Sequence, residues 1–426
     1  MLTLCCLAAA SLLIFQAVLV FGFVRATRTP LNDLSQGSVH RVLVVLCARG
    51  NDPSFAECLE SLEQQSGERL QILLVTDHSE DPAVAEYQRH VARHPETQIR
   101  QLVAPLEFET CSLKCQSLAY AVAEHGAPAD VLLAIDADVV PSPTWVRQLQ
   151  AALDAPRSDR SVADAAFGNR WFQPATGAWG SWLRYVWNAA AIVQMHHYRI
   201  PWGGSLALRR EAVEKTQLVK IWRRALFEDV LITQVFSADR RIVVSAAPVF
   251  LVNRESCSLR TAWRWMVRQL LDVRLYHRSW PLVAGHAFAV AGLPAAFGVG
   301  VGYGWLTGQF EYAAQAACAW LVFQLLNLGL LYWISSAAEA AISRQTSGSV
   351  DATHVRFPGE RLWWWGRMLC LLPLVQLWHC AAVIQAALVR RTEWRGIHYE
   401  VRGPWAIRRG PYTPCSAATP AATDGD

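Results

Sequence analysis

Residues 131–138 read VLLAIDAD, five apolar residues that run directly into two carboxylates. The apolar run fits a buried strand. Asp136 and Asp138 alternate with Ala137, so an extended backbone points both carboxylates to the same side. Turns after strands often contain Asp, and a lone D-x-D is weak evidence for function. Two such carboxylates repel each other unless a divalent cation or a hydrogen-bonding ligand lies between them. An ordinary turn and a ligand site are therefore both open from this stretch alone.

The surrounding sequence alternates between short β-rich runs and helical segments. Strands are expected at 41–47, 70–76, 98–103 and 131–135, with helices around 53–65, 82–94, 113–124 and 143–153. This alternation predicts an α/β domain at residues 40–255, with a mostly parallel sheet covered on both faces. The first strand is followed by CARGND and not by G-x-G-x-x-G, and the sequence contains no P-loop motif. A dinucleotide-binding domain and a P-loop ATPase are therefore disfavoured.

Polar residues follow three of the four expected strands. Arg49 to Asp52 follow the first strand, Asp77 follows the second, and the D-x-D follows the fourth. The carboxyl ends of parallel strands meet at one edge of the sheet, where α/β proteins bind ligands. Three polar strand ends indicate a ligand site more strongly than a single D-x-D does.

The composition indicates a membrane protein with one sizeable soluble domain. The chain has 426 residues, 53% of them hydrophobic, and 19 tryptophans. Residues 2–24 carry no charge and are long enough to cross a bilayer, and Arg25 and Arg28 follow them. This pattern favours an uncleaved anchor over a signal peptide and places the next domain in the cytosol. The chain is therefore expected to be an integral, multi-pass membrane protein. If the source is bacterial, the expected location is the inner membrane.

Three further apolar stretches, at 281–306, 313–341 and 363–389, predict membrane helices within residues 281–389. The tail at 390–426 is basic, which argues that it is cytosolic. Three full crossings after a cytosolic domain would instead place it outside. One stretch is therefore expected to be re-entrant or interfacial, or to cross twice.

Charge and cysteine usage exclude several function classes. The net charge is only +4, which does not suggest nucleic-acid binding, and only three of the 39 basic residues are lysines. The eleven cysteines are scattered and never spaced C-x-x-C. This usage fits neither a disulfide framework nor a zinc site, and it suits a reducing compartment.

Three later segments carry candidate functional residues. PWGGSLALRRE (201–211) contains Trp202, Gly203 and Gly204, and its glycines would permit a close backbone approach in a cleft wall or form a simple turn. LFEDVLIT (226–233) places Glu228 and Asp229 at the start of an apolar helix, where they are either chemical groups or partners of the helix dipole. Residues 258–278 alternate apolar and arginine side chains with helical spacing, which predicts an amphipathic interfacial helix.

The order of these motifs resembles the family-two glycosyltransferases with a GT-A fold, over about residues 40–280. Within that family it looks most like the ceramide glucosyltransferase-like group, with its D-x-D, (D/E)-D and (Q/R)-x-x-R-W series. TEWRGIHY (392–399) resembles the W-R-G-x-x-Y tail of those enzymes. Two motifs depart from the pattern: Thr261 stands where Gln or Arg is expected, and CARGND replaces P-A-x-N-E.

The resemblance implies a single-sugar, inverting transfer from a nucleotide sugar, in particular a uridine one, to a membrane lipid, with ceramide as one candidate. In this interpretation Asp138, with Asp136, would hold Mg²⁺ or Mn²⁺, which neutralises the leaving diphosphate. Asp229 would be the general base, with Glu228 as its partner. Trp202, Gly203 and Gly204 would line the acceptor entrance, and the expected nucleotide-sugar contacts are Arg49, Asp77, Lys114, Asp136, Arg264 and Trp265. A processive polysaccharide synthase and a non-catalytic membrane scaffold remain as alternatives.

Overall fold

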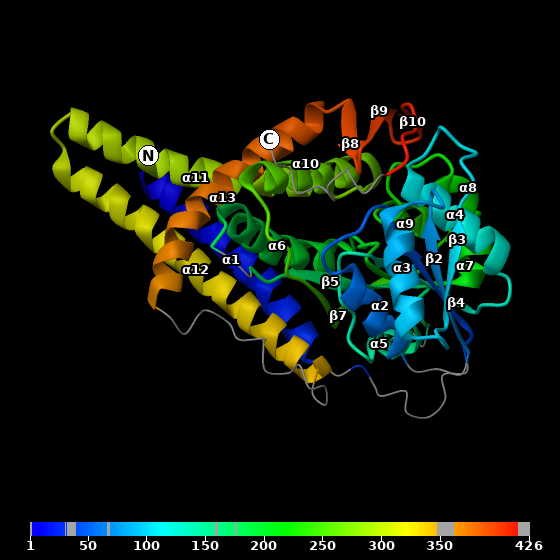
Figure 1. Cartoon of the computed structure of the whole chain (residues 1–426). Helices are drawn as coiled ribbons and strands as arrows, with labels where there is room; N and C mark the ends of the chain where they lie inside the picture. Colours follow the sequence, from blue (N-terminus) through cyan, green and yellow to red (C-terminus); the bar gives the residue numbers. More distant parts are fainter. Residues whose placement is uncertain are drawn as a thin grey trace.

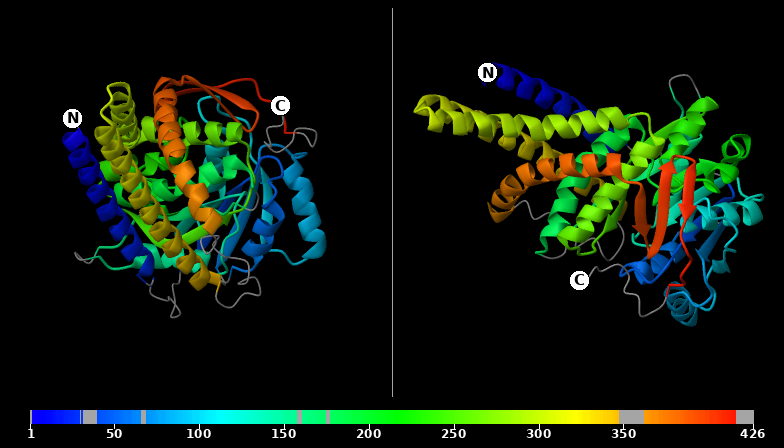
Figure 2. Two further views of the ribbon diagram at one scale, coloured as in Figure 1. Left: turned by 90° about the vertical axis from the view of Figure 1, so that its left-hand side faces the viewer. Right: turned by 90° about the horizontal axis from the view of Figure 1, so that it is seen from above.

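The computed structural model describes residues 2–29, 31, 40–65, 69–157, 161–174, 177–346 and 362–415. An α/β domain occupies one end of the molecule, and long apolar helices extend away from it (Figure 1). The same division is visible from above, where the first helix and the membrane helices project from one side of the sheet domain (Figure 2).

A seven-stranded sheet forms the centre of the α/β domain, in the order β3-β2-β1-β4-β6-β5-β7. The pairs β1·β2, β1·β4, β2·β3 and β5·β7 are parallel, whereas β6 runs antiparallel to both of its neighbours. The expectation of a mostly parallel sheet is therefore confirmed. The strands are β1 (Val42–Cys47), β2 (Leu70–Thr76), β3 (Ile99–Val103), β4 (Val131–Asp136), β5 (Ala165–Phe172), β6 (Ser205–Arg209) and β7 (Val243–Asn253).

Helices cover both faces of this sheet because its strands are nearly continuous apolar runs whose successive side chains point to opposite faces. On β1, Leu43 and Val45 pack into the core that includes α4, whereas Val44 and Leu46 pack into the core that includes α2 and α5. Asp81 caps α3 by accepting from the backbone N–H of Ala83 at 2.9 Å. The helices of the domain are α2 (Phe55–Glu63), α3 (Pro82–Arg93), α4 (Leu113–His125), α5 (Trp145–Asp154), α6 (Trp179–Tyr198), α7 (Arg210–Lys215), α8 (Leu218–Trp222) and α9 (Leu231–Ala238).

Four helices in the described chain are long and apolar enough to cross a membrane. They are found within α1 (Leu2–Arg28), α11 (Trp280–Leu306), α12 (Phe310–Thr346) and α13 (Leu362–Leu388). The predicted amphipathic helix is α10 (Leu259–Tyr276), which begins at an N-cap where Ser258 Oγ accepts from the Thr261 N–H. It packs against α6 and α13 beside the α/β domain (Figure 1).

The C-terminal tail contains a second sheet that was not predicted. β8 (Arg391–Trp394), β9 (Ile397–Gly403) and β10 (Ala406–Arg409) form an antiparallel sheet, and residues 416–426 of the expected tail lie outside the described residues. The backbone N–H of Arg409 donates to the Glu109 carbonyl at 2.7 Å. The Leu113 N–H donates to the Tyr399 hydroxyl at 3.3 Å. These bonds place the small sheet on the same side of the molecule as the α/β domain.

Candidate active site

A cavity of about 740 Å³ lies at the carboxyl ends of β1, β2 and β4. It is the edge of the sheet at which the sequence predicted a ligand site. Ten of the predicted site residues line it: Arg49, Asp77, Lys114, Asp136, Asp138, Trp202, Glu228, Asp229, Arg264 and Trp265. Gly203 and Gly204 do not line it, but they lie directly behind its wall.

Asp136, the last residue of β4, is held by basic and aromatic groups. Its carboxylate accepts from Lys114 Nζ at 2.5 Å and from Trp202 Nε1 at 3.2 Å, and it also pairs with Arg170. Burial alone would raise the pKa of Asp136, but the positive charges of Lys114 and Arg170 outweigh burial and lower it to about 2. Asp136 is therefore a charged, positioned group.

Asp138 has weaker contacts with basic groups than Asp136 has, and it lies near other carboxylates. Its Oδ2 accepts from Asn253 Nδ2 at 3.2 Å, and its Oδ1 lies 3.5 Å from Arg170. Burial, followed by the charges of Asp138 and Asp52, raises the pKa of the nearby Glu255 to about 7. Crowded carboxylate oxygens form a hard donor set of the kind that Mg²⁺ and Mn²⁺ prefer. The residues present therefore fit a divalent cation at Asp138.

Lys114 bridges the D-x-D to the E-D pair. Besides Asp136, its Nζ contacts Glu228 Oε1 at 2.5 Å. Burial raises the pKa of Glu228 to about 7 against the opposing charge of Lys114, and the charges of Asp229 and Asp136 add to the rise. Lys114 thus links Asp136 and Glu228, which lie 92 positions apart in the sequence.

Asp229 lies just before a helix and not at its first residue, since α9 begins at Leu231. Its two carboxylate oxygens accept from the backbone N–H groups of Gly203, at 2.7 Å, and Val230, at 2.8 Å. Asp272 of α10 also forms a hydrogen bond with Asp229, and burial, followed by the Asp229 charge, raises the pKa of Asp272 well above its ordinary value. These two causes favour the protonated form of Asp272, which can donate to the Asp229 carboxylate.

The two glycines allow these groups to approach each other. A Cβ at Gly203 would lie 2.1 Å from Glu228 Oε1, and one at Gly204 would lie 2.6 Å from Asp136 Oδ2. Any larger residue would separate the D-x-D from the E-D pair. The two glycines thus permit a close backbone approach behind the cavity wall, and their predicted place at the acceptor entrance stays a prediction.

Asp77 and Arg49 form the far end of the cavity. They are paired with each other, and the Arg49 Nε donates to the Arg395 carbonyl at 3.0 Å. Asp77 Oδ1 is buried, and no group in the described part of the chain forms a hydrogen bond with it. A buried carboxylate oxygen without a donor is costly unless a ligand supplies one.

The R-W pair predicted on α10 contributes to the opposite wall. Trp265 packs edge-on against Phe172, at 5.1 Å between ring centroids, and against Trp187, at 5.2 Å. Arg264 and Arg268 also line the cavity. Burial, followed by the charges of Arg395 and Arg170, lowers the pKa of Arg268 to about 10. Like charges held this close favour a bound anion between them.

The sequence analysis missed several residues of the site. Arg395 of the C-terminal sheet donates from both terminal nitrogens to Asp52, at 2.7 Å each. Its W-R-G motif was noticed, but no site role was assigned to it. Arg170 lies in the middle of β5 in no recognisable motif, and Asp272 is one acidic residue on a basic helix. Only the fold brings these residues into the cavity.

A second, smaller pocket adjoins the cavity, with a volume of about 90 Å³. It extends from the catalytic candidates towards the membrane helices, where His286 of α11 and His379 of α13 line it. Six residues line both spaces: Arg170, Trp202, Asp229, Trp265, Gln269 and Asp272. Asp229 therefore lies between a charged cavity and an apolar pocket.

Comparison with known families assigns the domain. Residues 43–216 match the family model described as glycosyl transferase family 2. This segment is a family 2 glycosyltransferase domain. The match confirms the expectation of a glycosyltransferase domain with the GT-A fold, whereas the assignment to the ceramide glucosyltransferase-like group stays a prediction. Among curated proteins, none matches the sequence.

Several solved glycosyltransferase structures are distantly similar to this chain. The mannosyltransferase PcManGT from Pyrobaculum calidifontis, in complex with GDP-Man and Mn²⁺, is 17% identical over 90% of this chain and 98% of that chain, with a TM-score of 0.47. TarS 1–349 from S. aureus, in complex with UDP-GlcNAc, is 12% identical over 88% and 100%, with a TM-score of 0.33. Glucosyl-3-phosphoglycerate synthase from Mycobacterium tuberculosis is 13% identical over 57% and 84%, with a TM-score of 0.35. At this distance, the roles of the site residues depend on the geometry of this chain alone.

Proposed function

We propose that this glycosyltransferase moves one sugar from a uridine-diphosphate sugar to a membrane lipid, with inversion at the anomeric carbon. The observation that carries the proposal is the position of Asp229. It lies where the charged cavity, which suits a nucleotide diphosphate, meets the apolar pocket that leads to α11 and α13. At this junction a lipid hydroxyl from the apolar side would meet a sugar donor from the charged side.

The nucleoside would occupy the end of the cavity at Asp77. A uracil ring carries one N–H donor, and Asp77 Oδ1 is a buried acceptor without a donor among the described residues. The diphosphate would then extend towards Arg268, whose pKa is lowered first by burial and then by the charges of Arg395 and Arg170. A bound anion would offset the repulsion between these arginines. Asp138, with Asp136, would hold Mg²⁺ or Mn²⁺, which supplies charge neutralisation to the diphosphate when bound.

The transfer itself would be a direct displacement. The acceptor oxygen attacks the anomeric carbon, the bond from that carbon to the diphosphate oxygen breaks, and the nucleoside diphosphate leaves. Asp229 takes the proton of the acceptor hydroxyl. Its orientation is fixed by the Gly203 N–H and by Asp272. The sugar would lie between the rings of Trp265 and Trp202.

The lipid acceptor, with ceramide as one candidate, is supported by the apolar pocket and by the neighbouring membrane helices. Trp263 of α10 packs edge-on against Trp378 of α13 at 5.1 Å between ring centroids, so the catalytic wall is continuous with an apolar helix. α1, α11 and α12 extend away from the catalytic domain (Figure 2). An acceptor that enters from the bilayer would reach Asp229 without leaving an apolar environment.

The test is to incubate the purified full chain in lipid vesicles with a panel of radiolabelled nucleotide sugars and to analyse the lipid extract. We expect one labelled glycolipid carrying one sugar, formed only with Mg²⁺ or Mn²⁺. Long polymer would instead indicate a processive synthase. An absence of both transfer and donor hydrolysis across the panel would indicate a non-catalytic scaffold and contradict the proposal.

A further inference from the structure

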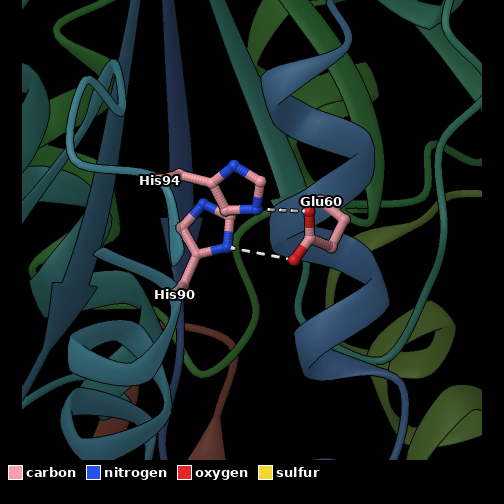
Figure 3. Close-up of side chains that lie close together, drawn as sticks. All are labelled: Glu60, His90 and His94. Atoms are coloured by element: carbon pink, nitrogen blue, oxygen red, sulfur yellow. Dashed lines mark ion pairs between the residues drawn. The ribbon is translucent and has the colours of Figure 1, made fainter. Parts of the chain in front are cut away.

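Glu60, His90 and His94 form a cluster on the outer helices of the α/β domain, outside the catalytic cavity. Glu60 lies on α2, whereas His90 and His94 lie at the end of α3, four residues apart and therefore on one helix face (Figure 3). The two imidazoles converge on the Glu60 carboxylate, with His94 Nε2 at 2.8 Å and His90 Nδ1 at 3.6 Å. One ligand atom from each residue lies within 4.8 Å of the others.

The tautomer of His90 is set by a second carboxylate. His90 Nε2 lies 3.1 Å from Glu63 Oε1, and an ionised carboxylate only accepts hydrogen bonds, so this nitrogen carries the proton. The Nδ1 of neutral His90 is then an acceptor directed at Glu60. It is fully buried, and no group in the described ranges forms a hydrogen bond with it. A cation between these two acceptors would satisfy both of them.

We propose that Glu60, His90 and His94 bind a divalent transition-metal ion, with Zn²⁺ as the ion that fits best. Two imidazoles and one carboxylate suit Zn²⁺, whereas Mg²⁺ and Ca²⁺ prefer oxygen ligands. Donors about 2.0–2.2 Å from a tetrahedral ion lie roughly 3.3–3.6 Å apart. The 3.6 Å between His90 Nδ1 and Glu60 Oε1 matches that spacing.

The surroundings of the cluster supply the other features of a metal site. Glu63 holds His90 in the manner of a carboxylate–histidine–metal triad and itself accepts from the Thr97 hydroxyl. His94 and Glu60 are 39% and 33% exposed, which leaves one side open for a water ligand. Arg93 pairs with Glu60 at 2.6 Å, but it also lies 3.9 Å from Glu86, which gives it another partner when an ion binds.

A bound ion would join α2 to α3. These helices follow β1 and β2, whose carboxyl ends lead to Arg49, Asp52 and Asp77 in the cavity. The ion would therefore stabilise the part of the domain that carries the nucleoside end of the site. Its binding is independent of the D-x-D, because none of the three ligands lines the cavity.

The experiment is a Zn²⁺ titration of the full chain, purified in detergent without a histidine tag and stripped with a chelator. Calorimetry and thermal unfolding would follow the wild type, His94→Ala, Glu60→Gln and Glu63→Gln. His125→Ala is the matched control, since His125 lies at the end of α4 outside the cluster. We expect one equivalent of Zn²⁺ and a rise in Tm for the wild type and the control. His94→Ala and Glu60→Gln should bind at least tenfold more weakly, and Glu63→Gln about 10–100-fold more weakly.

Three further measurements decide between this site and others. Asp138→Asn should keep the Zn²⁺ site, and an excess of Mg²⁺ should not displace the ion. When Co²⁺ replaces Zn²⁺, its absorption spectrum should be that of an ion bound by nitrogen and oxygen ligands. Thiolate charge-transfer bands would assign the ion to cysteines and overturn the proposal. The proposal also fails if the wild type shows no saturable binding, or if His94→Ala binds as tightly as His125→Ala.

Discussion

Asp229 is the single residue on which the proposed reaction most depends. Its two oxygens are held by backbone N–H groups and its neighbour Asp272, which leaves the carboxylate fixed at the junction of the two pockets. Asp229→Asn keeps the shape but cannot accept a proton. We expect turnover to fall by about 10²–10⁴-fold with donor affinity nearly unchanged. Steady-state turnover and donor binding of the purified variant would check this, with Asp239→Asn, exposed just after the other end of α9, as control. Near-normal turnover would remove Asp229 from the reaction.

Asp138 should determine the metal dependence. Asp136 is already neutralised by Lys114 and Arg170, whereas Asp138 faces the carboxylates of Glu255 and Asp52. Asp138→Asn should fold normally but lose metal-dependent donor binding. Binding of a labelled donor across a Mn²⁺ titration measures this directly. If the variant bound donor and metal as the wild type does, the cation would have to be placed elsewhere.

The raised pKa of Glu228 predicts that the stability of the folded chain depends on pH. Its pKa is raised to about 7 in the folded chain, so the folded state favours the protonated form. Its contribution to stability is fully present below its unfolded pKa, near 4.3, and is lost as the pH rises to about 7. Glu228→Gln should therefore flatten the fall of Tm between about pH 4.5 and 7, whereas the exposed Glu80→Gln should not. Equal pH profiles for the two variants would contradict this assignment.

At the scale of elements, the strands and helices of the catalytic domain followed from the sequence because their apolar periodicity is strong. The predicted strands at 70–76 and 131–135 match β2 and β4 to within one residue. The small sheet β8–β10 could not be predicted in this way, because its short strands are rich in arginine and partly exposed. Arg170, Asp272 and Arg395 were missed for a related reason. Each enters the site through long-range packing and not through a local motif.

The C-terminal sheet should control donor binding through Arg395. Its guanidinium forms two hydrogen bonds with Asp52, and its carbonyl accepts from Arg49, which pairs with Asp77. Arg395→Lys cannot form the paired contact. We expect donor KM to rise about tenfold or more with a smaller change in kcat. Arg402→Lys, exposed on β9, is the control. An unchanged KM for Arg395→Lys would show that the small sheet only stabilises the fold.

At the scale of the whole molecule, the docked tail limits how the C-terminal helices can cross the membrane. β8–β10 contact Glu109 and Leu113 of the α/β domain, so the chain returns to the side on which α10 lies. If these helices cross a membrane, an even number of full crossings separates α10 from the tail. Three apolar helices satisfy this if one of them crosses twice or if one does not cross, the two alternatives that the basic tail left open in the sequence.

We expect α13 to be a helix that does not cross, because both of its ends contact the side of the catalytic domain. Near its start, Arg367 donates to the Gly177 carbonyl at 2.6 Å and stacks over Trp179 at 4.7 Å. At its other end, the Ala387 carbonyl accepts from Arg274 of α10 at 2.7 Å. Pro373 lies inside the helix, where it permits a bend.

Thiol labelling of single cysteines introduced into a cysteine-free chain would test this arrangement in sealed, oriented vesicles. We expect cysteines placed at Ser79 in the domain and at Arg402 in the tail to react from one side. A cysteine placed at Gln309, between α11 and α12, should react only from the other side. By the positive-inside rule, we expect the side shared by Ser79 and Arg402 to be the cytosolic one, because Arg25 and Arg28 lie in the last turn of α1. Labelling of Arg402→Cys from the side of Gln309→Cys would show that α13 crosses completely, and labelling of Ser79→Cys from outside would reverse the orientation.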